Sequence, residues 1–217
     1  MISSLKNHCG KFLNRRGGIM KNKRKGFTLL ELIITLSLTV IVLGVIYTFF
    51  LSNSKTLSRI EINSDLQLEA EGIQQELLLY GTQAEGISEI NNIQITDSNK
   101  YNYEGLPEDG KLDVTEVTFK IGVEYFSFVY NGENKTLTLN KVNEFGTVIS
   151  DTTLRLPRDL SKNVTEFKVR PLDYRMNPNG NFNETTGLEI SLVLNKEKGY
   201  SDVTIPLSVI VKFRNKS

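Results

Sequence analysis

The sequence predicts an α+β fold in which one long N-terminal helix packs on an antiparallel β-sheet. Residues 27–86 combine an apolar run with a helically spaced apolar stripe, which predicts a single long helix. Several segments of residues 87–217 instead alternate apolar and polar residues with a period of two, as half-buried strands do. The length of 217 residues suits one modest domain with an appendage.

Residues 27–51 are mostly apolar, interrupted by Glu31 and a few Thr and Ser residues. As a helix rising about 1.5 Å per residue, this segment would be roughly 37 Å long, enough to cross a bilayer with some tilt. The apolar core of a cleaved secretory signal is usually only about 7–15 residues, and no small-residue cleavage site follows Leu51. We therefore expect a membrane-spanning helix. A carboxylate inside such a span is disfavoured by roughly 2.5–3.5 kcal/mol, which makes Glu31 a functional candidate.

The helix is expected to continue over residues 52–86 as an amphipathic segment. Its apolar residues are spaced by three or four, as on one face of a helix. They are Ile62, Leu66, Ala70, Ile73, Leu77 and Tyr80. We expect this stripe to pack against the protein's own domain, and we expect the helix to stop near Gly81 or Gly86.

Two hairpins are predicted in the β region. Residues 117–121 and 126–130 alternate, and Asn131–Asn134 turns the chain towards Leu137 and Leu139.

Residues 164–169 read as a further strand, and residues 188–213 as a terminal hairpin with its turn at Lys196–Gly199. Because Pro206 cannot donate a ladder hydrogen bond, its strand is expected at a sheet edge or paired on only one side at that residue.

Charge is distributed unevenly along the chain. Residues 1–26 hold eight of the 26 Lys and Arg residues and no acid, so residues 27–217 hold 18 bases against 25 acids, a net charge of −7. A basic flank before an apolar span predicts that the N-terminus stays cytoplasmic and that the acidic remainder lies outside. An acidic domain also disfavours direct binding of nucleic acid, which needs a basic surface.

His8 and Cys9 are the only residues of their types, and both precede the apolar run. If the N-terminal segment is removed, disulfides, Cys/His zinc sites and catalysis by His or Cys are excluded. We accordingly predict no catalytic residue, no cofactor and no metal ligand. One acidic loop is interpreted as solvated, although calcium binding by its oxygens stays open. Its residues are Glu104, Glu108, Asp109 and Asp113.

The nine residues Lys23-Arg24-Lys25-Gly26-Phe27-Thr28-Leu29-Leu30-Glu31 resemble the class III signal of type IV prepilins and pseudopilins. The resemblance implies that a membrane-embedded prepilin peptidase cuts between Gly26 and Phe27 and that the new N-terminal Phe27 is methylated. It also implies that Glu31 pairs with the amine of a neighbouring subunit and sets axial register. An intrachain role stays open, because Glu31 lies one turn from Phe27 and favours the positive helix N-terminus. The basic leader residues are Lys21, Lys23, Arg24 and Lys25.

Two translation starts are open, Met1 and Met20. A start at Met20 gives a leader of seven residues, the length typical of prepilins, and makes residues 1–19 an untranslated upstream extension. Arg15-Arg16 can be encoded by AGG-AGG, a purine run three codons before Met20, where a ribosome-binding site belongs. We expect Met20, and the nucleotide sequence decides the point.

Two departures from the best-known major pilins suit a minor pilin or pseudopilin. Thr48 stands where many pilins have a helix-kinking proline, and residues 27–217 contain no cysteine for a C-terminal disulfide. The terminal hairpin resembles the layout of W-type minor pilins and J-type pseudopilins. The resemblance implies further partners: other pilin subunits, an assembly ATPase and a membrane platform protein. Pilus initiation or adhesion, protein secretion and DNA uptake are all open uses.

Two other classes of protein stay open as alternatives to a pilin subunit. A signal-anchored binding or sensor module outside the cytoplasm would keep residues 20–26 and would never polymerise. An exported enzyme would have to work with carboxylates alone. Retention of the leader distinguishes the first of these classes from a processed subunit.

Overall fold

The computed structural model describes residues 26–96, 98–99, 101–199 and 201–214. The predictions for residues 1–25, which include the upstream extension and the basic leader residues Lys21, Lys23, Arg24 and Lys25, lie outside the described residues. The chain divides into two compact units, Met1–Phe49 and Phe50–Ser217. One helix, α1 (Leu29–Gln83, 55 residues), begins in the first unit and ends in the second.

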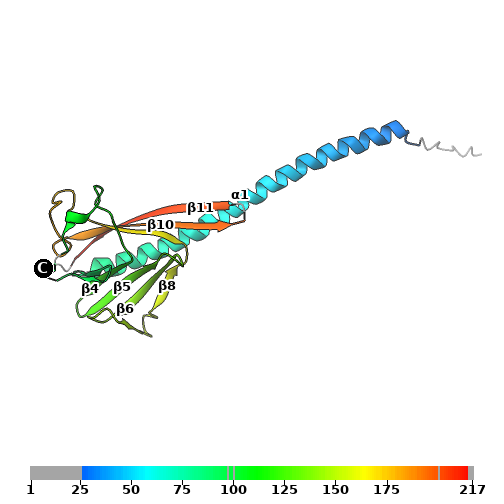
Figure 1. The fold of residues 1–217 in the computed structure, drawn as a ribbon. Coiled ribbons are helices and arrows are strands. Elements are labelled where there is room, and N and C mark those ends of the chain that lie inside the picture. Colours follow the sequence, from blue (N-terminus) through cyan, green and yellow to red (C-terminus); the bar gives the residue numbers. More distant parts are fainter. Residues whose placement is uncertain (1–25, 97, 100, 200, 215–217) are drawn as a thin grey trace, which may run out of the picture. The chain divides into compact units, whose positions relative to one another are not determined.

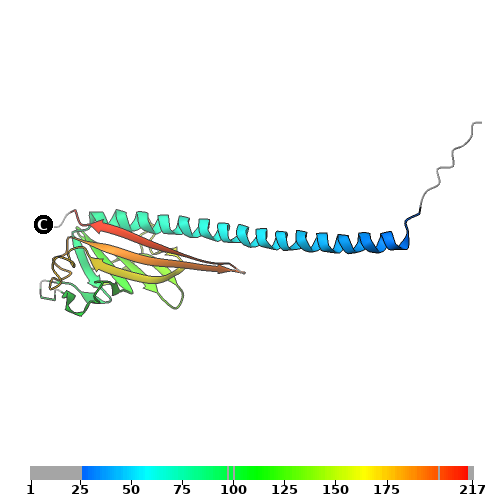
Figure 2. The ribbon, with the colours of Figure 1, turned by 90° about the horizontal axis from the view of Figure 1, so that it is seen from above.

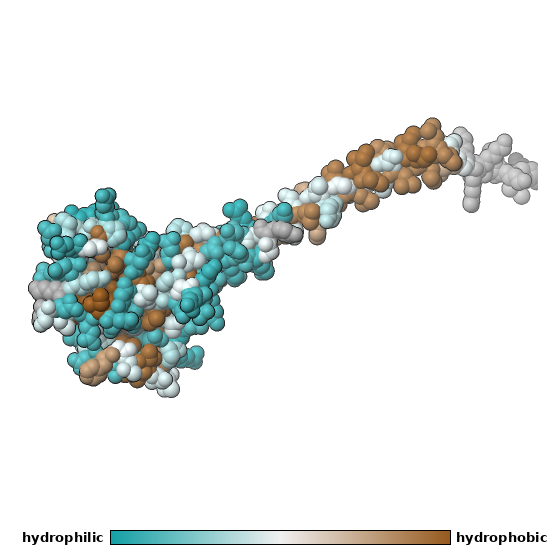
Figure 3. Space-filling view, viewed as in Figure 1, coloured by the Kyte–Doolittle hydropathy of each residue, from teal (hydrophilic) through white to brown (hydrophobic). Residues whose placement is uncertain are grey.

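The first part of α1 is apolar and uncovered. Every described residue from 26 to 57 is exposed, and the helix contains a stretch long and apolar enough to cross a membrane. Apolar side chains cover this part of the helix in Figure 3. Threonine hydroxyls within it bond to carbonyls of the same helix: Thr35 Oγ1 donates to the Glu31 carbonyl at 2.9 Å and Thr39 Oγ1 to the Thr35 carbonyl at 2.7 Å. These polar residues are therefore compatible with an apolar environment.

The second part of α1 buries the predicted stripe in its own domain, as expected. Buried residues recur at helical spacing. They are Ile62, Leu66, Ala70, Ile73, Leu77 and Gly81. Tyr80 is half-buried, and its ring centroid lies 4.4 Å from that of Phe126. Each fully buried Ile or Leu side chain contributes about 1.5–3 kcal/mol, so this stripe is what holds the helix to the sheets.

The helix ends between the two glycines near which it was expected to stop, although neither glycine is its last residue. Gly81 lies inside α1, where a Cβ would overlap the Val211 Cγ1 methyl and stand 3.1 Å from Cγ2, so the glycine permits close approach of the helix to the sheet. The helix ends at Gln83, three residues before the predicted boundary, and Gly86 begins the first strand. The reason is that the Glu85 N–H already donates to the Lys120 carbonyl at 2.8 Å, which joins the chain to the sheet.

The β region forms two antiparallel sheets rather than the single sheet that the sequence predicts (Figures 1 and 2). The larger sheet has the order β2-β1-β4-β5-β6-β7, and β8 pairs with β6. Its strands are β1 (Gly86–Ile90), β2 (Ile93–Gln94), β4 (Glu116–Ile121), β5 (Glu124–Asn131), β6 (Thr136–Val142), β7 (Val148–Ile149) and β8 (Arg158–Ser161).

The smaller sheet has the order β11-β10-β9-β3. Its strands are β3 (Leu112–Asp113), β9 (Val164–Pro171), β10 (Gly187–Lys198) and β11 (Ser201–Lys212), and a short 3₁₀ helix covers Tyr103–Gly105. Buried residues of α1 and of both sheets form one continuous core. The α+β class, a long N-terminal apolar helix packed against antiparallel strands, is confirmed.

Both predicted hairpins are present. Asn131 pairs with Thr136 at the end of β5 and β6, and the Asn131 side chain accepts the Glu133 N–H at 3.0 Å in the turn between them. In the terminal hairpin, Lys198 pairs with Ser201, so the strands run past the predicted turn at Lys196–Gly199.

Strand β11 lies at a sheet edge and pairs only with β10, as Pro206 predicted.

Candidate processing and assembly site

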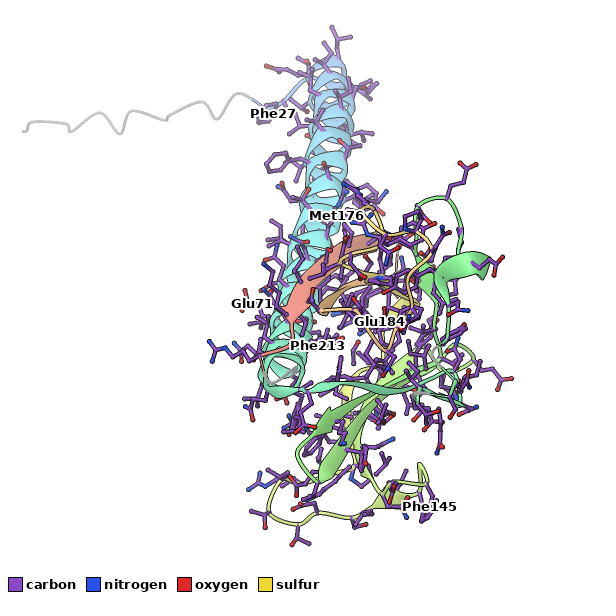
Figure 4. The ribbon with its side chains drawn as sticks, turned by 90° about the vertical axis from the view of Figure 1, so that its left-hand side faces the viewer. Phe27, Glu71, Phe145, Met176, Glu184 and Phe213 are labelled. Carbon is purple, nitrogen blue, oxygen red and sulfur yellow. The ribbon has the colours of Figure 1, made fainter. Side chains whose placement is uncertain are left out.

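The segment before α1 is open to solvent. Gly26, Phe27 and Thr28 are not helical, and α1 begins at Leu29. Nothing lies within 4 Å of where a Cβ on Gly26 would stand, and Phe27 is 78% exposed. Figure 4 shows Phe27 at the start of the helix. A peptidase needs a non-helical, accessible bond, and the bond between Gly26 and Phe27 has both properties.

Thr28 and Glu31 form a capping box at the first turn of α1. The Thr28 carbonyl accepts the first helical hydrogen bond, from Leu32 N–H at 3.1 Å. Thr28 Oγ1 accepts from the Glu31 N–H at 3.2 Å, and Glu31 Oε2 accepts from the Thr28 N–H at 3.3 Å. The Thr28 hydroxyl also donates to Glu31 Oε2 at 3.4 Å. Such reciprocal bonds satisfy amide groups that a helix start otherwise leaves unpaired.

The capping box uses one oxygen of the Glu31 carboxylate. Each hydrogen bond that reaches this side chain from the described residues ends on Oε2, and Oε1 accepts none of them. A carboxylate oxygen can accept more than one hydrogen bond. The geometry therefore gives Glu31 a local role at its own helix and leaves Oε1 without a hydrogen bond from the described residues.

Thr28 is the site residue that sequence reasoning missed. Its signal was present, because a Thr followed three residues later by Glu before an apolar run is the sequence signature of a capping box.

The acidic loop does not converge on one point. Asp109 Oδ1 accepts the Lys111 N–H at 3.1 Å, and Asp113 lies 3.6 Å from the Lys168 ammonium. Glu104 and Glu108 are exposed. Across the part of the chain that the structure describes, no three His, Cys, Asp or Glu residues are arranged to hold a metal ion.

Residues 21–47 match the family model of the prokaryotic N-terminal methylation motif. The matched span begins in the basic leader, includes Gly26, Phe27 and Glu31, and ends in the apolar part of α1. Comparisons with curated proteins and with solved structures give no match. The chain therefore carries a class III N-terminal methylation motif of the type IV prepilin kind, joined to a pilin-like α+β fold.

Proposed function

We propose that this protein is a minor pilin or pseudopilin, a structural subunit of a type IV pilus or of a filament like that of type II secretion. One observation carries the proposal: the methylation motif lies directly before a helix whose first part leaves its apolar side chains uncovered, whereas its second part is buried in its own domain. A membrane can cover the uncovered part before assembly, and neighbouring helices can cover it in a filament. Both environments are apolar, so the exchange between them costs little burial free energy.

Cleavage between Gly26 and Phe27 would change the charge of the helix start. It removes Lys21, Lys23, Arg24 and Lys25 together and keeps the apolar span. The new amine of Phe27, which we expect to be methylated, is a single cation in apolar surroundings. An unpaired charge there is strongly disfavoured, so the amine needs a carboxylate partner.

Glu31 is the acceptor that we assign to this amine in a neighbouring subunit. Its Oε2 is held by the capping box of its own helix, while Oε1 stays available. The two roles considered from the sequence are therefore compatible: the cap fixes the direction of the carboxylate, and the free oxygen pairs with the neighbour. Pairing at a fixed residue would set the axial step between subunits.

The wider assignment follows from the motif and from composition. Prepilin peptidase, other pilins, an assembly ATPase and a membrane platform protein are the partners of such a subunit. We place the precursor in the cytoplasmic membrane with its leader inside, and the assembled subunit outside the cell. The lack of cysteine in residues 27–217 and the terminal hairpin of β10 and β11 support a minor subunit of the W or J type. Gene neighbours would distinguish adhesion, secretion and DNA uptake.

Mass spectrometry of the N-terminus tests the proposal. Protein extracted from the membrane should begin at N-methylated Phe27. A Gly26→Val variant should retain the leader, since a β-branched residue before the cut restricts the backbone. Gly72→Val, a glycine substitution far from the motif, should be processed normally. A chain that keeps Met20 or Met1, with no methylated Phe27, would identify a signal-anchored module and refute the pilin assignment.

A further inference from the structure

A polar pocket of about 530 Å³ lies on the face of the larger sheet that points away from the core. Val117 and Phe119 of β4 are buried in the core. Because side chains alternate along a strand, Thr118 and Lys120 point to the opposite face. The pocket forms there between β1, β4, the start of β5 and the loop that follows β6. Residues that line it include Ser88, Glu89, Thr96, Thr118, Lys120 and Tyr125. Its volume falls in the range of small-ligand sites.

Two neighbouring polar side chains of this pocket, Thr118 and Glu89, have no hydrogen-bond partner among the described residues. Thr118 is 1% exposed, and its Oγ1 is buried with no hydrogen-bond partner. Glu89 pairs with Thr118 in the register of β1 and β4, so the two side chains are neighbours on one face. Native proteins rarely leave buried polar atoms unpaired, and such an atom points to a missing ligand or water.

The Glu89 carboxylate is held in an unfavourable place for a charge. Burial first, and then the nearby Glu116 carboxylate, raise the pKa of Glu89 above its ordinary value. No hydrogen bond or ion pair from the described residues reaches this carboxylate to offset the effect. Its Oε2 lies 3.4 Å from where a Cβ on Gly146 would stand, which places the carboxylate under the loop after β6. A β-bulge between Ile87 and Glu89 aims the side chain there.

The charges around the pocket are mainly negative. Glu85, Glu89 and Glu144 line it against one cation, Lys120, whose Nζ lies 3.8 Å from Glu85 Oε2. Glu116 adds a further carboxylate beside it, which accepts a hydrogen bond from Ser127. The pocket thus attracts cations and repels anions.

We propose that this pocket binds an organic cation on an aliphatic stem, namely the guanidinium or ammonium group of an Arg or Lys side chain from a partner protein. Glu89 is the counter-charge and Thr118 Oγ1 accepts a hydrogen bond from the cation. Tyr125 supplies a ring against which a guanidinium can stack. Phe145, 81% exposed in the loop that also contributes Asn143 and Glu144, offers an apolar contact for the rest of the partner chain (Figure 4).

Calorimetric titration of the full chain in detergent micelles tests this inference, with Nα-acetyl-arginine amide as the probe. We expect saturable binding that Glu89→Gln weakens roughly tenfold, because it removes the counter-charge without changing the shape. Thr118→Val should weaken binding severalfold. Glu133→Gln is the matched control, since Glu133 is exposed in the turn between β5 and β6, at the other end of the strands. It should leave the affinity unchanged.

Three results would overturn the inference: no saturable binding by the wild-type chain, equal affinities for Glu89→Gln and Glu133→Gln, or equal binding of the neutral polyol methyl glucoside. Thermal unfolding checks the fold of each variant. Both pocket substitutions remove an unpaired group and should keep or raise the melting temperature. A fall in both variants would show a structural role and would also overturn the proposal. Because the pocket lies outside the methylation motif, its test is independent of filament assembly.

Discussion

At the scale of single residues, the two carboxylate oxygens of Glu31 differ in their contacts at the start of the helix. Oε2 closes the capping box with Thr28, and Oε1 accepts no hydrogen bond from the described residues. An N-cap hydroxyl stabilises a helix by about 1 kcal/mol, whereas a charge left unpaired in an apolar environment costs several times more. Loss of the Glu31 charge should therefore affect assembly far more than it affects the helix itself.

We predict that Glu31→Val is cleaved after Gly26 but is incorporated into filaments at least tenfold less than wild type, because the methylated Phe27 amine that we propose would lose its acceptor. Thr28→Val should reduce incorporation less, since it frees the carboxylate but keeps its charge. Immunoblots of sheared filaments against whole cells measure incorporation, and N-terminal mass spectrometry verifies processing of each variant. Normal incorporation of Glu31→Val would refute the register role.

At the scale of elements, the sequence predicted those features that depend on residues close together in the chain. The buried stripe from Ile62 to Leu77 could be predicted from its helical spacing, and the turn after Asn131 from its residue types. Glu69 shows the limit. It lies off the stripe and reads as a solvated side chain, yet it accepts hydrogen bonds from Ser161 at 2.7 Å and Asn163 at 2.8 Å, more than 90 residues away. No local spacing encodes such a contact.

Gly81 shows the same limit, because its role depends on Val211 in a distant strand. We predict that Gly81→Ala lowers the free energy of unfolding, since overpacking at a tight contact costs about 1–3 kcal/mol and outweighs a gain of roughly 1 kcal/mol in helix propensity.

Gly72→Ala is the control in the same helix. Nothing lies within 4 Å of where its Cβ would stand, so only the propensity gain applies and stability should rise. Urea unfolding in micelles, followed by circular dichroism, compares the two variants. Equal stabilisation of both would show that the helix does not approach β11 closely at Gly81.

At the scale of the whole molecule, the sequence predicted the α+β class but one sheet instead of two. The hairpins are local, whereas the division into sheets depends on pairings between distant segments, such as β3 with β9 and β1 with β4. The pocket near Glu89 could not be predicted from the sequence either. Its residues come from five separate stretches of chain, 85–89, 94–96, 118–125, 143–144 and 183, and none of them forms a motif by itself.

The uneven distribution of charge along the chain predicts its orientation in the membrane. Residues 1–26 are basic and residues 27–217 carry a net charge of −7, so the leader should stay inside and the domain should lie outside. In a Cys9→Ser background, Glu133→Cys places a thiol on an exposed turn of the domain, and Asn22→Cys places one in the leader. A membrane-impermeant maleimide should label the Glu133→Cys chain in intact spheroplasts. In cells without prepilin peptidase, it should label the Asn22→Cys chain only after permeabilisation. The opposite pattern would contradict the membrane orientation that we propose, in which the leader meets the peptidase on the cytoplasmic side.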